Sequence, residues 1–319
     1  MRRIGVLSSG GDAPGMNAAI RAVVRKSIYH GLEPIGIRRG FTGLIANEMV
    51  RMELGSVADI IQRGGTILRT ARSKEFMTPE GRDKAVQNLR NMQIDGLIVL
   101  GGDGSFRGAL KLAEAGIKVI GVPASIDNDV PCTEYSIGFD TAVNTALDAI
   151  NKIRDTATSH ERIFIIEVMG HRTGYIALEA GLAGGAESIL LPEMPYDLDE
   201  IVTKLHRGQA RGKLHSILVV AEGAVNAIEL GNQIQELAKM DTRVTILGHI
   251  QRGGSPTATD RVLASRMAAY AVDLLRQGES RKMVGMKAGM VSSWDLESIL
   301  NCRKLPDKDL IELANILAI

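Results

Sequence analysis

Aromatic residues are scarce in this sequence, at 3% of its 319 residues. Proteins that bind single-stranded nucleic acid stack bases on aromatic side chains, so the scarcity argues against such a surface. The sequence also has no excess of either charge, because its 38 Lys and Arg residues nearly balance its 37 Asp and Glu residues and leave a net charge of +1. We therefore expect neither nucleic acid nor an anionic membrane to be bound through the overall charge of the protein.

Cysteine and long apolar runs are also nearly absent. The two cysteines, Cys132 and Cys302, are too few for a disulfide framework, although a single disulfide stays open. No apolar run approaches the ~18 residues that a membrane helix needs. The apolar stretch 4–7 that follows Arg2 and Arg3 is too short for a signal peptide. The sequence thus predicts a cytoplasmic protein with no membrane partner.

Short apolar runs alternate with longer amphipathic stretches along the chain. Strands are expected at residues 4–7, 97–100, 119–122, 163–166, 217–220 and 244–247, and helices at 16–30, 106–115 and 141–157. The strands are apolar at successive positions, so both faces should be covered, as in parallel sheets between helices. The pattern predicts an α/β fold, and the length predicts about two domains. Ligands of such folds bind beyond the carboxyl ends of the strands.

Two glycine-rich loops occupy that position. The sequences Gly10-Gly11-Asp12 and Gly101-Gly102-Asp103 each follow an expected strand and precede a helix. Glycine lets a phosphate approach the backbone, and a helix N-terminus offers free N–H groups. Two such loops facing one crevice would hold the two ends of a polyphosphate, whereas either loop alone is equally well explained as a tight turn. The standard P-loop and dinucleotide fingerprints are absent.

Carboxylates accompany these loops. Asp103 would repel a phosphate unless a cation lay between them, so we expect it to hold Mg²⁺. The alternative is that Asp103 only caps the helix that follows. Asp127 and Asp129 lie in the loop 123–131, which a proline closes at each end. A rigid loop of this kind suits a general base, although an Asp/Asn-rich turn has the same composition. Glu222 follows another strand, where it would accept a hydrogen bond from a sugar hydroxyl.

Basic side chains that suit phosphate clamps also follow the expected strands. They are Arg72, Arg154, Arg162, Arg243 and Arg252. Each of them alone is more simply explained as a solvated surface arginine, with the exception of Arg252. Its glycine-flanked loop, which contains His249, is a poor place for an incidental surface charge. A second basic set consists of Arg21, Arg25, Arg211, Lys213 and His215, for which a solvated face is the alternative.

Together these motifs resemble the bacterial ATP-dependent 6-phosphofructokinases over essentially the whole chain. The matching segments are 10–17, 101–105, 126–129, 153–157, 169–170, 221–223 and 248–257. The resemblance implies two similar three-layer α/β domains with largely parallel sheets and an active site in the cleft between them. A larger ATP-binding domain would hold residues 1–138 and 251–305, and a smaller sugar-phosphate-binding domain 139–250 and 306–319. It also implies a homotetramer.

The resemblance implies transfer of the ATP γ-phosphoryl group to the 1-hydroxyl of fructose 6-phosphate. Asp127 would be the general base with Asp129 in support, Asp103 would hold Mg²⁺, and Arg72 would stabilise the transition state. ATP would be contacted by Gly11, Arg72, Ser73, Gly102, Asp103, Gly104 and Ser105. Fructose 6-phosphate would be contacted by Ser125, Asp127, Arg162, Met169, Gly170, His171, Glu222, Arg243, His249 and Arg252, with Arg162 and Arg243 supplied by a neighbouring subunit. ADP or phosphoenolpyruvate would bind as effectors at Arg21, Arg25, Arg154, Gly185, Glu187, Arg211, Lys213 and His215.

The sequence departs from the family pattern at a few positions. His171 stands where Arg is usual, with Arg172 next to it, and neutral imidazole lacks the fixed charge of a guanidinium. Arg69 replaces an aromatic residue near the ATP loop, and Leu214 replaces a residue that is often basic in the effector region. His171 is the one feature that invites the alternative of a non-catalytic regulatory relative.

The phosphoryl donor depends on two small residues. Pyrophosphate-dependent relatives carry Asp and Lys at the positions of Gly104 and Ala124, where they fill the adenine-side space. Ala124 itself replaces a usual Gly. Both residues are small here, so the resemblance favours ATP. A pyrophosphate-dependent enzyme, or a kinase for another ketose phosphate, is the alternative.

Overall fold

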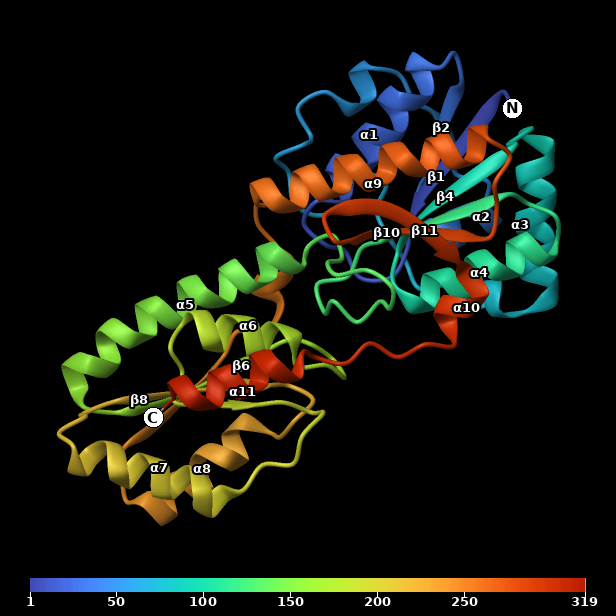
Figure 1. The fold of residues 1–319 in the computed structure, drawn as a ribbon. Coiled ribbons are helices and arrows are strands. Elements are labelled where there is room, and N and C mark those ends of the chain that lie inside the picture. The colour runs from blue at the N-terminus through green and yellow to red at the C-terminus, as the bar shows by residue number, and fades with distance from the viewer. Residues whose placement is uncertain (319) are drawn as a thin grey trace. The chain divides into compact units, whose positions relative to one another are not determined.

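The computed structural model describes residues 1–318, which divide into two units (Figure 1). The first unit comprises residues 1–125, 130–141 and 252–304, and the second comprises 126–129, 142–251 and the segment from residue 305. The chain passes between the units at 141/142, 251/252 and 304/305, and the domain boundaries expected at 138/139, 250/251 and 305/306 stay a prediction. Residues 126–129, placed in the first domain from the sequence, belong to the second unit.

A seven-stranded sheet forms the centre of the first unit, in the order β11-β10-β5-β4-β1-β2-β3. Its strands are β1 (Arg3–Ser8), β2 (Glu33–Ile37), β3 (Met49–Arg51), β4 (Gly96–Gly101), β5 (Val119–Pro123), β10 (Lys282–Lys287) and β11 (Met290–Asp295). The inner strands are parallel, and the edge strands β3 and β11 are antiparallel to their neighbours. Every residue of β4 and β5 is buried, which explains why their sequences are apolar without alternation.

Helices cover this sheet on both faces. They are α1 (Met16–Tyr29), α2 (Gly40–Ile45), α3 (Pro79–Asn91), α4 (Asp103–Glu114), α9 (Ala258–Arg276) and α10 (Leu296–Leu300), with short 3-10 turns η1 (Gly55–Val57) and η2 (Glu75–Met77). Figure 1 shows α1 and α9 together on one face and α3, α4 and α10 on the other. The second face is filled by a cluster that includes Phe41, Phe76 and Phe106, and the rings of Phe41 and Phe76 stack at 4.2 Å.

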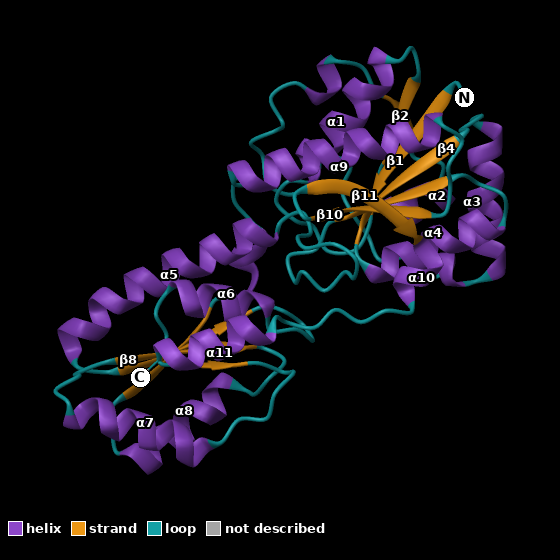
Figure 2. Cartoon of the chain, in the orientation of Figure 1, coloured by secondary structure: helices purple, strands orange, loops and turns teal. Residues whose placement is uncertain are grey.

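The second unit contains a four-stranded parallel sheet in the order β7-β8-β6-β9. Its strands are β6 (Ile163–Val168), β7 (Ser188–Leu190), β8 (Ser216–Ala221) and β9 (Thr242–Ile246). Its helices are α5 (Phe139–His160), α6 (Tyr175–Ala183), α7 (Leu198–Ala210), α8 (Ala227–Ala238) and α11 (Lys308–Leu317), and the 3-10 helix η3 (Gly248–Arg252) follows β9. Figure 2 shows helices on both faces of this sheet as well.

The predicted α/β class with largely parallel sheets is confirmed, and each of the six expected strands is present. One expectation was wrong in detail, because β9 is an edge strand and Ile246 remains 51% exposed. The helix expected from residue 106 begins at Asp103, and the one expected at 141–157 extends over residues 139–160. Cys132 and Cys302 are both exposed free thiols. Within residues 1–318 no helix is long and apolar enough to cross a bilayer.

Candidate active site

The two glycine loops lie side by side at the carboxyl ends of neighbouring strands in the first sheet. Strands β1 and β4 are parallel neighbours with Ser8 opposite Leu100, so the loops that follow them leave from the same edge. The backbone N–H of Ser9 donates to the carbonyl of Leu100 at 2.9 Å, which extends the pairing into the loops. The Ser105 hydroxyl would lie 3.4 Å from a Cβ built on Gly10. The resulting backbone surface suits adjacent phosphate groups.

The guanidinium of Arg252 lies directly against the first of these loops. A Cβ built on Gly11 would collide with the Arg252 guanidinium, and Nη1 of Arg252 donates to the carbonyl of Asp12 at 3.4 Å. A side chain at position 11 would therefore push the Arg252 guanidinium away from the loop. The contact places a fixed positive charge on the loop that the sequence associates with phosphate.

Asp103 is the first residue of α4 and has no capping role. The N-cap is Gly102, and no side chain caps the helix. The Asp103 carboxylate pairs with Arg107 Nε at 3.0 Å and is 48% exposed. In the described residues no group of three or more His, Cys, Asp or Glu side chains is arranged to hold a metal. One exposed carboxylate beside a phosphate loop nevertheless fits Mg²⁺, which is commonly bound by one or two carboxylates together with substrate phosphates and water.

The loop that carries Asp127 is held by Thr173, a residue that sequence reasoning missed. The Thr173 hydroxyl lies 3.0 Å from the carbonyl oxygens of both Asp127 and Gly170. This hydroxyl links the loop of Asp127, the expected general base, to the segment that contains Gly170, which is expected to contact the sugar. Both belong to the second unit. Asn128 adopts a left-handed conformation with φ 51°, which gives the turn between the carboxylates of Asp127 and Asp129 its sharp bend.

A second missed residue, Tyr175, lies near Asp129 at the start of α6. Burial, together with the carboxylates of Glu193 and Asp129, raises the pKa of the Tyr175 phenol well above its ordinary value. The phenol therefore stays protonated at neutral pH. Glu193 also accepts the backbone N–H of Gly174 at 3.0 Å, which fixes the first turn of α6 next to this loop.

The segment 169–171 is held by two side chains from other loops. Glu222 Oε1 accepts the backbone N–H groups of Gly170 at 3.3 Å and His171 at 2.8 Å. Buried Gln251, a third missed residue, accepts the N–H of Met169 at 3.3 Å and donates to the carbonyl of Gly248 at 3.1 Å. The carboxylate expected to accept from a sugar hydroxyl thus uses one oxygen to position the loop.

His171 has an unusual backbone in this segment. Its φ is 52°, in the left-handed region, and its side chain is exposed. A Cβ built on Gly223 would collide with the carbonyl of His171, so the turn after β8 packs closely under the segment. Arg172 is exposed at the adjacent position.

Arg162 and Arg243 meet at one carboxylate that sequence reasoning did not identify. Arg162 Nε lies 2.6 Å from Asp241 Oδ2, and Arg243 Nη2 lies 3.2 Å from both oxygens of Asp241. The arginines come together because β6 and β9 pair in parallel, with Phe164 opposite Arg243. The result is a pair of neighbouring guanidinium groups suited to one phosphate.

Part of the expected effector set also converges in the second unit. Arg154 donates to the carbonyls of Gly184 and, at 3.0 Å, Gly185. Glu187 pairs with Lys213 and accepts the N–H of Ile217. Burial lowers the pKa of His215, Glu187 opposes this shift, and the charges of Arg154 and Lys213 add to it, so the imidazole is neutral at pH 7.

The remaining expected residues lie on several different elements. Arg21 and Arg25 lie on α1 in the first unit, and Arg211 ends α7 in the second. Arg72 and His249 are exposed, on the loop before η2 and on η3 respectively. The Ser73 hydroxyl accepts the N–H of Phe76 at 3.2 Å, and the N–H of Ser125 donates to the carbonyl of Ile137 at 3.1 Å.

Comparison with known proteins identifies full-length relatives. The family model described as Phosphofructokinase matches residues 3–275. The chain is 58% identical over 331 residues to the ATP-dependent 6-phosphofructokinase of Halothermothrix orenii and 57% identical over 319 residues to that of Bacillus subtilis, covering 100% of each chain in both alignments. The solved structure of phosphofructokinase from Saccharomyces cerevisiae is similar with a TM-score of 0.89 and 34% identity, over 99% of this chain and 47% of that one. The present chain thus spans about half the length of the yeast chain.

Proposed function

The chain belongs to the phosphofructokinase family, and we propose from this premise that it transfers the γ-phosphoryl group of ATP to the 1-hydroxyl of fructose 6-phosphate. The products are fructose 1,6-bisphosphate and ADP, which makes the chain a glycolytic phosphotransferase. The observation that carries the proposal beyond sequence identity is the packing of Arg252 on Gly11. This contact joins a candidate sugar-phosphate residue to a candidate ATP loop within one unit.

Asp127 is the general base of the proposed reaction. Its carboxylate accepts the proton of the 1-hydroxyl as that oxygen attacks the γ-phosphorus, and the bond to the ADP oxygen breaks on the opposite side. The Thr173 contact to the Asp127 carbonyl supports this role, because a general base acts only at hydrogen-bond distance from its proton. Asp129 and the protonated Tyr175 complete the polar surroundings of the base.

Phosphoryl transfer depends mainly on positioning and on charge compensation. Gly11, Ser73 and the Gly102–Ser105 loop bind the phosphates of ATP, and Arg72 meets the charge on the transferring group. Asp103 would hold Mg²⁺, which neutralises phosphate charge when bound. The exposure of Arg72 and Asp103 supports these assignments, since both groups must reach a ligand.

Fructose 6-phosphate is bound by the segment 169–171 together with Ser125, Glu222, His249 and Arg252. Arg162 and Arg243 bind its 6-phosphate from a neighbouring subunit of a homotetramer. Their shared contact with Asp241 supports a common phosphate. ADP or phosphoenolpyruvate acts as effector where Arg154, Gly185, Glu187, Lys213 and His215 meet in the second unit, and Arg21, Arg25 and Arg211 are the further effector-binding residues. The reaction takes place in the cytoplasm.

The test is steady-state phosphorylation of fructose 6-phosphate with ATP and Mg²⁺ by the native chain and by Asp127→Ser. We expect activity in the native chain and a loss of roughly 10²–10⁴-fold in kcat for the variant. The matched control is Asp83→Ser on the exposed face of α3, which should retain native activity. Pyrophosphate, and sedoheptulose 7-phosphate as acceptor, should be poor substrates.

Several outcomes would overturn the proposal. Native activity with pyrophosphate but not ATP would contradict the donor. Undiminished activity in Asp127→Ser would contradict the base. Binding of fructose 6-phosphate without turnover, measured by calorimetry, would indicate a regulatory relative, and His171→Arg would then be tested for rescue.

A further inference from the structure

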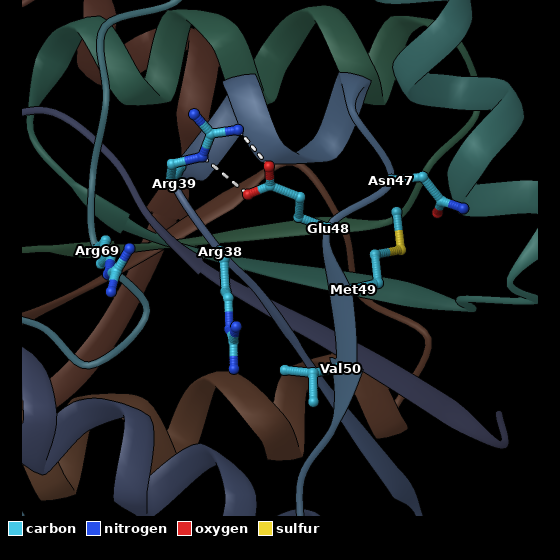
Figure 3. A pocket seen from close by; sticks show the side chains of 7 residues that line it. All are labelled: Arg38, Arg39, Asn47, Glu48, Met49, Val50 and Arg69. Carbon is cyan, nitrogen blue, oxygen red and sulfur yellow. Dashed lines mark hydrogen bonds and ion pairs between the residues drawn. The ribbon is translucent and has the colours of Figure 1, made fainter.

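A cavity of about 550 Å³ opens in the first unit at the carboxyl end of β2, and the reaction proposed above does not use it (Figure 3). Arg38 and Arg39 follow β2 directly, Glu48 precedes β3, and Arg69 belongs to the loop before Arg72. Because β2 is the parallel neighbour of β1, the cavity lies one strand beyond the first glycine loop, on the edge of the sheet where ligands of α/β folds bind.

The charges around the cavity do not cancel. Glu48 is the only carboxylate among the lining residues, and Arg39 binds it with two hydrogen bonds, one of them 2.8 Å from Nε to Oε2 (Figure 3). The pKa of Glu48 lies below its ordinary value mainly because of this hydrogen bond, and the charges of Arg39, Arg38 and Arg69 lower it further. Within residues 1–318, Arg38 and Arg69 form no ion pair of their own. Three arginines and one carboxylate therefore line the cavity, and the excess is two positive charges.

Hydrogen bonds tie down the backbone of the residues that carry these guanidinium groups. The N–H of Arg39 donates to the carbonyl of Leu68 at 2.8 Å, and the N–H of Arg38 donates to that of Glu48 at 3.0 Å. The Ser8 hydroxyl donates to the carbonyl of Arg69 at 3.0 Å. Both Arg39 and Arg69 have left-handed backbones, with φ of 55° and 60°, an arrangement that costs free energy for side chains other than glycine.

The remaining wall is amphipathic. Met49 and Val50 supply apolar surface, and the exposed Asn47 supplies an amide. The volume lies in the ~300–1,000 Å³ range of small-molecule sites. A guanidinium binds phosphate through two parallel hydrogen bonds, and two unpaired guanidinium groups balance the charge of a dianion. We propose that this cavity binds a small organic phosphate monoester, with the phosphate at Arg38 and Arg69 and the organic group against Met49 and Val50.

The binding test uses phenyl phosphate and follows the methyl resonance of Met49 by NMR in the full chain enriched with ¹³C-methyl methionine. Met49→Leu assigns the resonance. We expect a saturable shift of this signal in the native chain. In Arg38→Gln/Arg69→Gln the midpoint should rise by at least about a hundredfold, roughly tenfold for each arginine removed. The control Arg51→Gln/Arg63→Gln removes the same charge from exposed positions of the same unit and should leave the midpoint unchanged.

Ligand chemistry is tested in the same titration. Phenol, which has no phosphate, should leave the Met49 resonance in place, and methyl phosphate should bind more weakly than phenyl phosphate because it buries less apolar surface. An unshifted resonance up to about 10 mM phenyl phosphate would refute the site. Equal midpoints in the native chain and in Arg38→Gln/Arg69→Gln would refute the role of the arginines. Thermal melts of each variant establish that it is folded, and none of these readouts depends on phosphoryl transfer.

Discussion

Removing the Glu222 carboxylate should weaken the use of fructose 6-phosphate without changing the use of ATP. Oε1 of Glu222 accepts the N–H groups of Gly170 and His171 at 3.3 and 2.8 Å. These two N–H groups define the course of the segment that is proposed to contact the sugar. In Glu222→Ala both lose their acceptor, and the left-handed backbone at His171 loses a contact that stabilises it.

The size of the effect follows from the two bonds. A hydrogen bond to a charged acceptor contributes about 1.5–3 kcal/mol, and the shorter bond to His171 should account for most of this. The segment is exposed at His171, so water replaces part of the lost interaction. We therefore expect kcat/KM for fructose 6-phosphate to fall by about 10–100-fold in Glu222→Ala. Glu222→Gln keeps an uncharged acceptor of the same shape and should lose only about threefold to tenfold.

The assay is steady-state kinetics with fructose 6-phosphate varied at saturating ATP, and then ATP varied at saturating fructose 6-phosphate. The expected signature is a raised KM for the sugar phosphate and an unchanged KM for ATP. Equal losses in Glu222→Ala and Glu222→Gln would show that the negative charge of the carboxylate matters and that an uncharged acceptor of the same shape does not replace it. A rise in the KM for ATP that matched the rise for the sugar would refute the positioning role.

Other consequences can be measured separately. Asp260 is buried and accepts hydrogen bonds from the N–H groups of Gly138 and Thr141 and from the Thr141 hydroxyl. Asp260→Ala should therefore lower the free energy of unfolding, measured by urea titration, by about 3–5 kcal/mol. A loss below about 1 kcal/mol would contradict this. Burial raises the pKa of Asp260 above its ordinary 3.8 despite these bonds, so its contribution to stability should fall as pH rises from that value through the folded-state pKa, and this decrease should be absent in Asp260→Asn. Gly11→Ala should displace the Arg252 guanidinium and lower kcat/KM for both substrates by about tenfold or more. An unchanged kcat/KM would show that the close approach of Arg252 to Gly11 is not needed. Asp103→Ala should raise the Mg²⁺ concentration for half-maximal activity at least about tenfold, and an unchanged Mg²⁺ dependence would refute the assignment.

Local sequence was sufficient for the fold class and for the six strands that were expected, but it did not identify β2, β3, β7, β10 or β11. Continuous apolar runs specified buried parallel strands because both faces of such strands are covered, and the glycine pairs after β1 and β4 indicated two loops at one sheet edge. These properties depend on residues within a few positions of each other. The exposure of β9 could not be predicted in this way, because it depends on which strand ends the sheet.

Only the tertiary structure decided which side chains support the site. Thr173 reaches Asp127 across 46 positions, Gln251 reaches Met169 across 82, and Arg252 reaches the carbonyl of Asp12 across 240. Threonine, glutamine and arginine are common surface residues, so no local pattern distinguishes those that hold a loop. The sequence by itself determined which residue types follow the strands, whereas folding chose their partners, since those contacts exist only when distant segments are packed together.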